Sequence, residues 1–276
     1  MHSLAVVTGA NRGLGAALAR CLAMSGCSVL LTGRDAPAVG RLAATLASTG
    51  LPAFAYPAAL DVSDMRSVRN FAEHCARSQA VPEVLINNAA VCERGWTRQV
   101  VRRSLKTNVI GPLALCRELG AVGCAAPRRA RRLRVLNVSS GDGELVYLNS
   151  ALQDEFRRAS SVRTLLQLLA RVTPPRQTIG GAPAHSPTPA YSVSKAALNA
   201  LTRILAGEHA GGTSELCASV WFAAVCPGDV STRMCSIEPR EALSADAAAH
   251  DLVWLLRHAE ALPSGKFWRQ CEAIPF

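Results

Sequence analysis

The sequence lacks the features that mark several classes of protein. Its longest apolar run, near residues 220–225, is far shorter than the roughly 20 residues that a membrane-spanning helix needs. The apolar stretch at residues 4–7 is too short for the core of a signal peptide. The ten cysteines include no Cys-x-x-Cys pair, and no histidines and cysteines share the spacing of metal ligands. We therefore expect a cytoplasmic protein with reduced thiols, and no membrane segment, metal site or disulfide framework.

Lysine is scarce, although the chain is basic. Only three lysines occur, and the formal net charge of +10 comes almost entirely from arginine. The densest group of cations is Arg128, Arg129, Arg131, Arg132 and Arg134. No aromatic residues are interleaved with these arginines, as they would be in a surface that binds single-stranded nucleic acid. We interpret the group as a solvated helix end and loop, and we expect no nucleic-acid partner. A nucleic-acid binder, the alternative, would show salt-dependent affinity.

The rest of the composition is that of a globular protein. Hydrophobic residues make up 49% and charged residues 18% of the 276 residues, enough for a sizeable core. Apolar, β-branched runs alternate with stretches of helical period. The expected strands cover residues 4–8, 28–32, 53–60, 84–86, 133–138, 217–225 and 266–268. This alternation predicts one α/β domain over residues 1–276, a doubly wound Rossmann fold with a parallel sheet of about seven strands.

A glycine-rich loop follows the first expected strand and precedes a helix. It reads Thr8-Gly9-Ala10-Asn11-Arg12-Gly13-Leu14-Gly15. Glycines let the backbone turn tightly and approach a pyrophosphate, which the amides of a helix N-terminus stabilise. The motif therefore predicts a dinucleotide site, with a merely structural turn as the alternative.

The second expected strand ends in Gly33-Arg34-Asp35, where a dinucleotide-binding fold contacts the adenosine ribose. An acid there accepts a hydrogen bond from a free ribose hydroxyl. A guanidinium instead binds a 2′-phosphate, through charged hydrogen bonds that contribute about 1.5 to 3 kcal/mol each. With Arg12 as the second cation, Arg34 predicts NADP(H) rather than NAD(H). Two features weigh against NADP(H): the neighbouring acid Asp35, and an Arg34 side chain that only faces solvent.

Polar residues follow three further expected strands. Asp61-Val62 follows the third, Asn87-Asn88-Ala89-Ala90 the fourth and Ser139-Ser140 the fifth. The asparagine amides can hold a loop together and present its backbone to the adenosine half of a cofactor. Because ligands bind at the carboxyl ends of parallel strands, we expect these residues at one edge of the sheet.

Tyr191 and Lys195 lie four residues apart. On a helix this spacing places a phenol and an ammonium on one face, where both can act on one proton. Neither of the other two tyrosines has a lysine four residues later. A free phenol, with a pKa of about 10, shuttles protons poorly at neutral pH, and a neighbouring cation lowers that pKa. We therefore expect Lys195 to activate Tyr191.

Taken in chain order, these motifs resemble the short-chain dehydrogenase/reductase family over nearly the whole length. The motifs are Thr8-Gly9-x-x-x-Gly13-x-Gly15, Asp61-Val62, Asn87-Asn88-Ala89, Asn108, Ser140, Tyr191-x-x-x-Lys195 and Pro227-Gly228. The resemblance implies a catalytic tetrad of Asn108, Ser140, Tyr191 and Lys195, with Ser140 rather than Ser139 as its serine. The family usually has glycine where this chain has Ala90.

The resemblance also implies the cofactor contacts. The loop at residues 226–232 would flank the nicotinamide, Lys195 would hold the nicotinamide ribose, and Asn108 would anchor a proton-relay water. The full expected set is Gly9, Asn11, Arg12, Gly13, Leu14, Gly15, Arg34, Asp61, Val62, Asn88, Ala89, Ala90, Tyr191, Lys195, Pro227, Gly228, Val230 and Thr232.

The segment between Ser140 and Tyr191 is much longer than in shorter family members. Apolar residues recur there at near-helical spacing, so residues 150–172 are expected to form one or two amphipathic helices, ended by Pro174-Pro175. With Arg12 and Arg34, this insertion at residues 141–190 resembles that of the monomeric NADPH-dependent carbonyl reductases. In those proteins the extra segment covers helices that otherwise pair with a second subunit, so the resemblance implies a monomer.

The implied activity is NADPH-dependent reduction of ketones, aldehydes or quinones to alcohols. Hydride would reach the carbonyl carbon while Tyr191 protonates the oxygen and Ser140 donates a hydrogen bond to it. A dedicated pteridine or steroid reductase would share every cofactor and tetrad residue and stays the alternative among enzymes. A cofactor-binding sensor or scaffold without turnover is the alternative outside enzymes.

Overall fold

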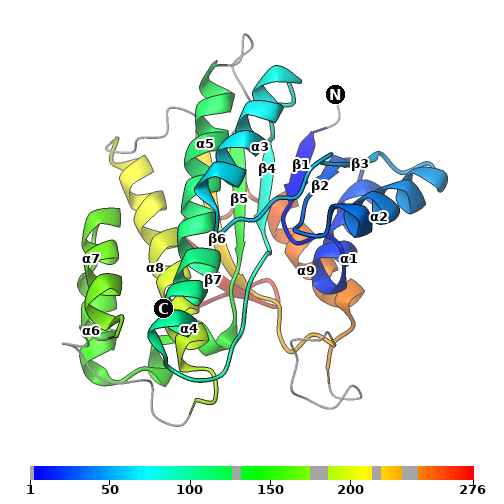
Figure 1. Cartoon of the computed structure of the whole chain (residues 1–276). Coiled ribbons are helices and arrows are strands. Elements are labelled where there is room, and N and C mark those ends of the chain that lie inside the picture. The colour runs from blue at the N-terminus through cyan, green and yellow to red at the C-terminus, as the bar shows by residue number, and fades with distance from the viewer. Residues whose placement is uncertain (1–2, 126–131, 175–185, 213–218, 232–241) are drawn as a thin grey trace.

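A single twisted sheet lies at the centre of the protein. The computed structural model describes residues 3–125, 132–174, 186–212, 219–231 and 242–276. Its sheet has eight strands in the order β3-β2-β1-β4-β5-β6-β7-β8, and every neighbouring pair is parallel except β7 and β8 (Figure 1). The strands are β1 (Leu4–Val7), β2 (Ser28–Leu31), β3 (Ala53–Ala55), β4 (Val84–Asn87), β5 (Leu133–Val138), β6 (Val220–Cys226), β7 (Lys266–Arg269) and β8 (Glu272–Ile274).

Helices cover both faces of the sheet (Figure 1). One face carries α1 (Gly13–Met24), α2 (Ala36–Ser48) and α9 (Ala245–Arg257). The other carries α3 (Met65–Arg77), α4 (Arg98–Leu105), the π-helical segment η1 (Lys106–Ile110), α5 (Gly111–Ala125), α6 (Ser150–Arg158), α7 (Val162–Val172) and α8 (Pro189–Ala210). This arrangement is the doubly wound fold predicted from the sequence.

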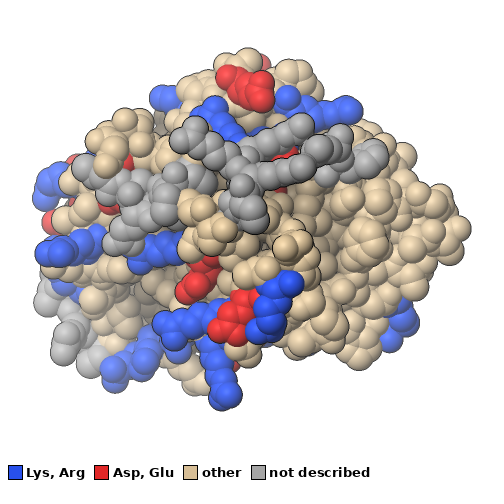
Figure 2. Space-filling model, turned by 90° about the horizontal axis from the view of Figure 1, so that it is seen from above, with Lys and Arg blue, Asp and Glu red and all other residues tan. Residues whose placement is uncertain are grey.

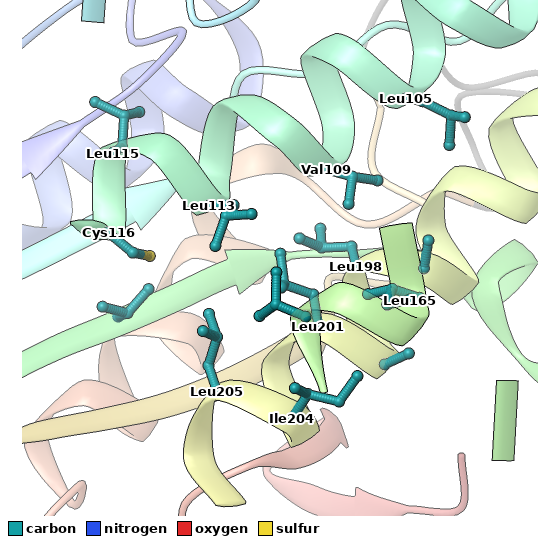
Figure 3. Close-up of a cluster of buried hydrophobic side chains, with 14 of the residues drawn as sticks. Leu105, Val109, Leu113, Leu115, Cys116, Leu165, Leu198, Leu201, Ile204 and Leu205 are labelled. Carbon is teal, nitrogen blue, oxygen red and sulfur yellow. The ribbon is translucent and has the colours of Figure 1, made fainter. Parts of the chain in front are cut away.

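Strand alternation divides the hydrophobic core into two layers. In β1, Ala5 and Val7 face the layer under α1, whereas Val6 faces the layer under α5 and α8. In the second layer, Val109 and Leu113 lie opposite side chains of α8 such as Leu201 (Figure 3). Because apolar side chains fill both faces of the central strands, these strands read as continuous hydrophobic runs.

Two details of the sheet differ from the sequence-based expectation. There are eight strands rather than about seven, because the chain turns back at Gln270 and Cys271 into the antiparallel β8. Both turn residues have positive φ, 49° and 63°, a conformation usually signalled by asparagine or glycine, so the sequence carried no turn signal. β3 ends at Ala55 rather than at residue 60, and Pro57, which has no N–H to donate, follows.

The segment before Tyr191 forms two helices, α6 and α7, where one or two were expected over residues 150–172. Asn149 caps α6 by accepting a hydrogen bond from Leu152 N at 2.9 Å, and Ser161 forms a capping box at the start of α7. Their apolar faces are buried in the same core layer as α8, and Arg203 of α8 donates a hydrogen bond to the Ala159 carbonyl between them at 2.8 Å. The pair is therefore docked on α8.

One face of the molecule carries charges of both signs. On the face shown in Figure 2, lysine and arginine side chains lie among aspartates and glutamates. Of the arginine group at residues 128–134, Arg128, Arg129 and Arg131 lie outside the described residues. Arg134 belongs to β5 and donates a hydrogen bond to the Leu256 carbonyl at 3.2 Å. Within the described part of the chain, no helix combines the length and apolar character needed to cross a membrane, and no three His, Cys, Asp or Glu residues are grouped as metal ligands.

Candidate active site

The candidate site lies at the carboxyl edge of the sheet. β1 and β4 are neighbours there, although β2 and β3 intervene in the sequence, so the chain reverses its winding direction between them. Loops on either side of such a switch point diverge and leave room for a ligand. The loops after β1, β4, β5 and β6 carry most of the residues that the sequence singles out.

The glycine loop adopts backbone conformations that require glycine. Gly9 and Gly13 have φ of +64° and +53°. A methyl group at Gly15 would overlap the Gly9 carbonyl oxygen and lie 2.6 Å from Nδ2 of Asn88. Arg12, the N-cap residue of α1, gives this helix no side-chain hydrogen bond. The loop therefore presents closely packed backbone and an uncapped helix N-terminus, a suitable cradle for a pyrophosphate.

The sequence reasoning missed the part played by Thr8. Its hydroxyl donates a hydrogen bond to the Ile86 carbonyl at 3.2 Å and accepts from the amides of Asn88 and Ala89, both at 3.0 Å. Asn88 returns a hydrogen bond from Nδ2 to the Thr8 carbonyl at 2.9 Å. Thr8 and Asn88 thus lock the loop after β1 to the loop after β4. A hydroxyl residue at the end of a buried strand, next to glycine, was the available signal.

Charged residues at the end of β2 divide into two roles. Asp35 caps α2, since its Oδ1 accepts a hydrogen bond from Ala38 N at 3.0 Å. Arg34 and Arg12 are exposed, and neither forms an ion pair with another residue that the structure describes. Asn11 lies nearby, with its Oδ1 3.7 Å from the position of a Cβ on Gly33. The acid is therefore engaged within the fold, while two guanidinium groups face solvent.

Asp61 and Val62 follow β3 at the far end of the cofactor half. Oδ1 of Asp61 accepts hydrogen bonds from the amide and the hydroxyl of Ser63, at 2.9 and 2.7 Å. Val62 is buried, and Gly111 at the start of α5 packs directly against its backbone. These contacts fix the turn after β3. Leu14 is also largely buried, whereas Ala89 and Ala90 are half-buried in the loop after β4.

Asn108 lies in the π-helical segment between α4 and α5. Local π-helical segments are frequent at functional sites, and no sequence pattern predicted this one. The buried Asn108 amide pairs with both backbone groups of Val91, each at 2.9 Å. It also donates to Oγ of Ser194 at 2.9 Å, and Ser194 donates to the Tyr191 carbonyl at 2.7 Å. Asn108 thus links the loop after β4 to the first turn of α8.

The two serines after β5 take different positions. Ser139 is buried, and its hydroxyl donates to the Lys195 carbonyl at 3.4 Å. Ser140 is half-buried, accepts a hydrogen bond at Oγ from Asp142 N at 3.2 Å, and interacts with the side chain of Tyr191. The hydroxyl beside the phenol is therefore that of Ser140.

Lys195 is buried beneath Tyr191. Its Nζ donates a hydrogen bond to the Val138 carbonyl at 2.7 Å and lies 5.4 Å from the centre of the Tyr191 ring. Only 2% of the lysine is exposed, and this burial lowers the pKa of the ammonium from 10.5 to about 8. At pH 7 the side chain is still mostly charged.

The pKa of Tyr191 moves opposite to the sequence-based expectation. Burial raises the pKa of the phenol above its ordinary value of 10.0, and the interaction with Ser140 opposes this only in part. Lys195 was expected to lower this pKa, but its Nζ is directed at the Val138 carbonyl and desolvation of the phenol dominates. At neutral pH Tyr191 is therefore a protonated acid.

The loop after β6 completes the edge. Pro227 and Gly228 are half-buried, and Gly228 has φ of +76°. Val230 is buried and forms a parallel bridge with Leu243, with hydrogen bonds of 2.8 Å on either side. Thr232, the expected contact to the carboxamide, lies outside the described residues. The remaining candidate residues lie within the described part of the chain. Ser140 and Lys195 lie beside Tyr191, and Asn108 is linked to the Tyr191 backbone through Ser194. The expected cofactor contacts lie along the same edge toward β2 and β3.

A model of the short chain dehydrogenase family matches residues 3–151. The chain belongs to this family. Carbonyl reductase (NADPH) 3 of Mus musculus is 33% identical over 242 residues, which cover 84% of this chain and 83% of the relative. The probable oxidoreductase EphD of Mycobacterium tuberculosis is 33% identical over 142 residues, half of this chain but only 23% of that protein.

The fold of this short-chain dehydrogenase also matches solved structures. Salutaridine reductase from Papaver somniferum superposes with a TM-score of 0.80 and covers 97% of this chain and 99% of its own, at 23% identity. At that identity the match speaks for the fold alone. Together with the family match, it confirms the Rossmann fold and the family resemblance expected from the sequence.

Proposed function

We propose that this protein is an NADP(H)-dependent oxidoreductase that reduces ketones, aldehydes or quinones to alcohols. The observation that carries the proposal is the placement of the Tyr191 phenol beside Ser140, with Nζ of Lys195 5.4 Å from the centre of its ring. This cluster stands on the same sheet edge as the glycine loop. An acid beside a dinucleotide cradle is what a carbonyl reduction requires.

The residues fit NADP(H). The loop after β1 has no room for side chains at Gly9 and Gly15, so a pyrophosphate can lie against its backbone. Arg12 and Arg34 supply two cations for a 2′-phosphate, while the neighbouring Asp35 is occupied as a helix cap. The similarity to carbonyl reductase (NADPH) 3 supports the same choice. When bound, NADPH supplies the hydride.

Tyr191 donates the proton. Since burial raises its pKa, the phenol holds its proton at neutral pH and can transfer it from Oη to a carbonyl oxygen as charge develops there. Ser140 orients this donor. Because Asp142 N donates to Oγ of Ser140, the hydroxyl proton is free to point toward the phenol oxygen or the substrate oxygen.

Lys195 and Asn108 support the donor from below. The Lys195 ammonium, held at the Val138 carbonyl, places a positive charge under the ring and favours the phenolate left after transfer. Asn108 donates a hydrogen bond to Ser194, which donates to the Tyr191 carbonyl. These hydrogen bonds fix the start of α8 relative to the loop after β4. We assign Lys195 also to the nicotinamide ribose.

The loss of NADPH absorbance over a panel of quinones, aldehydes, steroids and pterins tests this function. Reduction of several simple carbonyl compounds is expected. Reduction confined to steroids or pterins would instead favour a dedicated reductase, and NADPH binding without turnover on any compound would favour a sensor or scaffold.

Tyr191→Phe is the matched variant, because it removes only the hydroxyl. Turnover should fall by about 100-fold or more, since general acid catalysis contributes on that order. NADPH affinity, measured by fluorescence titration, should stay within about twofold. Near-normal turnover in this variant would contradict the assignment of Tyr191 as the proton donor.

We further propose that the protein is a monomer, because α6 and α7 bury their apolar faces together with that of α8. Analytical ultracentrifugation should give a single species near 29.1 kDa. A stable dimer or tetramer at micromolar concentration would contradict this.

A further inference from the structure

The turn that carries Ser140 is held firmly on its inner side. In this turn, η2 (Gly141–Gly143), the amide of Gly143 donates to the Ser140 carbonyl at 3.0 Å. Asn199 of α8 donates from Nδ2 to the Gly143 carbonyl at 3.2 Å. A methyl group added to Gly143 would lie 2.8 Å from Cβ of Lys195. The end of the turn is therefore packed against α8.

An ion pair holds the outer side of the same turn. Arg269, the last residue of β7, pairs with Glu144, which directly follows the turn. Gly141 lies against both: a Cβ there would be 3.2 Å from Nη2 of Arg269 and 3.5 Å from Oε1 of Glu144. The side chains of Arg269 and Glu144 are 36% and 25% exposed, so the pair is partly shielded from solvent. The turn thus passes between α8 and this pair.

Arg269 also reaches the neighbouring strand. It stands in register with Cys226 at the end of β6, and its guanidinium interacts with the Cys226 side chain. Cys226 directly precedes Pro227 and Gly228. One guanidinium therefore contacts the turn that carries Ser140 and the strand end from which the loop over the proposed nicotinamide site begins.

Partly exposed ion pairs contribute little to the free energy of unfolding, so stability alone gives a weak reason for this arrangement. Geometry gives a stronger one, because a catalytic group misplaced by about 1 Å can lower turnover by about 100-fold. We propose that Glu144 and Arg269 are positioning residues that hold the Ser140 hydroxyl against the Tyr191 phenol. This inference rests on the proposed function, in which Tyr191 is the proton donor.

Removing either charge should lower kcat selectively. Glu144→Gln and Arg269→Gln should each reduce kcat about tenfold, while the KM for NADPH stays within about twofold. Arg171→Gln is the matched control, because it breaks the Arg171–Glu155 pair, which has an N–O distance of 3.3 Å and side chains 46% and 26% exposed. That pair lies on α7 and α6, and its loss should leave kcat unchanged. Unchanged kcat in both Glu144→Gln and Arg269→Gln would overturn the proposal.

A double-mutant cycle shows whether the pair acts through Ser140. In a Ser140→Ala background, Glu144→Gln should cost less than about twofold in kcat, because the hydroxyl that it positions is already gone. A second full tenfold loss in that background would mean that the pair acts elsewhere and would overturn the proposal.

Hydrogen exchange tests the positioning without any turnover. Amide exchange in residues 139–145, followed by mass spectrometry, should become about tenfold faster in Glu144→Gln and Arg269→Gln and stay unchanged in Arg171→Gln. Unchanged exchange in this segment would overturn the proposal whatever the kinetics. If the wild-type protein turned over no carbonyl compound, the proposed function would fail, and faster exchange would still establish that the pair orders the turn.

Discussion

The two halves of the candidate site are built in different ways. The cofactor half, formed by the loops after β1, β2 and β3, relies on backbone shape and on exposed cations: glycines without room for a Cβ, and the solvent-facing Arg12 and Arg34. The catalytic half relies on buried side chains, with Tyr191 and Lys195 at 7% and 2% exposure. Binding in the first half should therefore depend on local residues, whereas chemistry in the second depends on how the whole core excludes water.

This difference decides which physical effect dominates in each half. Arg34 is exposed to water, so its contribution to binding is electrostatic and is screened by salt. Around Tyr191, desolvation outweighs the nearby ammonium and sets the direction of the pKa shift. If Tyr191 is the proton donor proposed above, a protonated phenol beside a charged lysine suits reduction at neutral pH, because oxidation would begin from the phenolate.

The largest expected effect comes from filling the cradle. Gly15→Ala places a methyl group onto the Gly9 carbonyl oxygen and against Asn88, with no flexible side chain to yield. NADPH affinity, measured by fluorescence titration, should fall by about 100-fold or more as the loop is displaced. An affinity within threefold of wild type would mean that the pyrophosphate lies elsewhere.

Gly40→Ala is the control for that variant. Gly40 lies in α2 and a Cβ there meets nothing within 4 Å. Alanine in a helix is favoured over glycine by about 0.5–1 kcal/mol, so this variant should unfold at a slightly higher urea concentration with unchanged NADPH affinity. Comparing Gly15→Ala with Gly40→Ala separates the effect of blocking the pyrophosphate site from any general effect of adding a methyl group.

The next effect is on cofactor choice. Arg34→Ala should lower NADPH affinity about tenfold to 100-fold, because it removes charged hydrogen bonds to the 2′-phosphate. The affinity for NADH should change less than about twofold, and so should kcat at saturating NADPH. Arg41→Ala, which removes an exposed arginine from α2, is the matched control and should leave both affinities unchanged. Equal losses for NADPH and NADH would exclude Arg34 as the 2′-phosphate contact.

The sequence predicted the cofactor half better than the catalytic half. Glycine spacing and the strand ends are local signals, so Gly9, Gly15 and Arg34 could be placed on their loops before the fold was known. The partnership of Asn108 with Val91 and Ser194 depends on the π-helical segment, and the ion pair of Glu144 and Arg269 joins residues 125 positions apart. No local pattern encodes such contacts.

The same reason explains the error about Tyr191. The four-residue spacing between Tyr191 and Lys195 can be read from the sequence. It correctly predicted that the two side chains lie on one face of a helix. The burial of both groups depends on the folded structure, in which Lys195 donates to the Val138 carbonyl of β5 and packs against Gly143. A sequence argument counted the charge and omitted the desolvation, which is the larger effect here.

The smallest expected effect is the pH dependence that this burial produces. Lys195 loses its charge through a pKa of about 8, while the raised pKa of Tyr191 keeps the phenol protonated. If the ammonium is needed to stabilise the phenolate, kcat for reduction should be flat below about pH 7 and fall by up to tenfold per unit above about pH 8. Because the folded state holds this proton less tightly than the unfolded state, Lys195 also destabilises the fold. This destabilisation is complete below about pH 8. It decreases as the pH rises from about 8 to the ordinary pKa of 10.5.

Lys195→Met separates the two consequences, since it keeps the stem and removes the charge. Its unfolding midpoint in urea at pH 7 should equal or exceed that of the wild type, because a buried ammonium has been removed, while kcat falls and loses its decline above pH 8. Retention of the wild-type decline in this variant would assign the ionisation to another group.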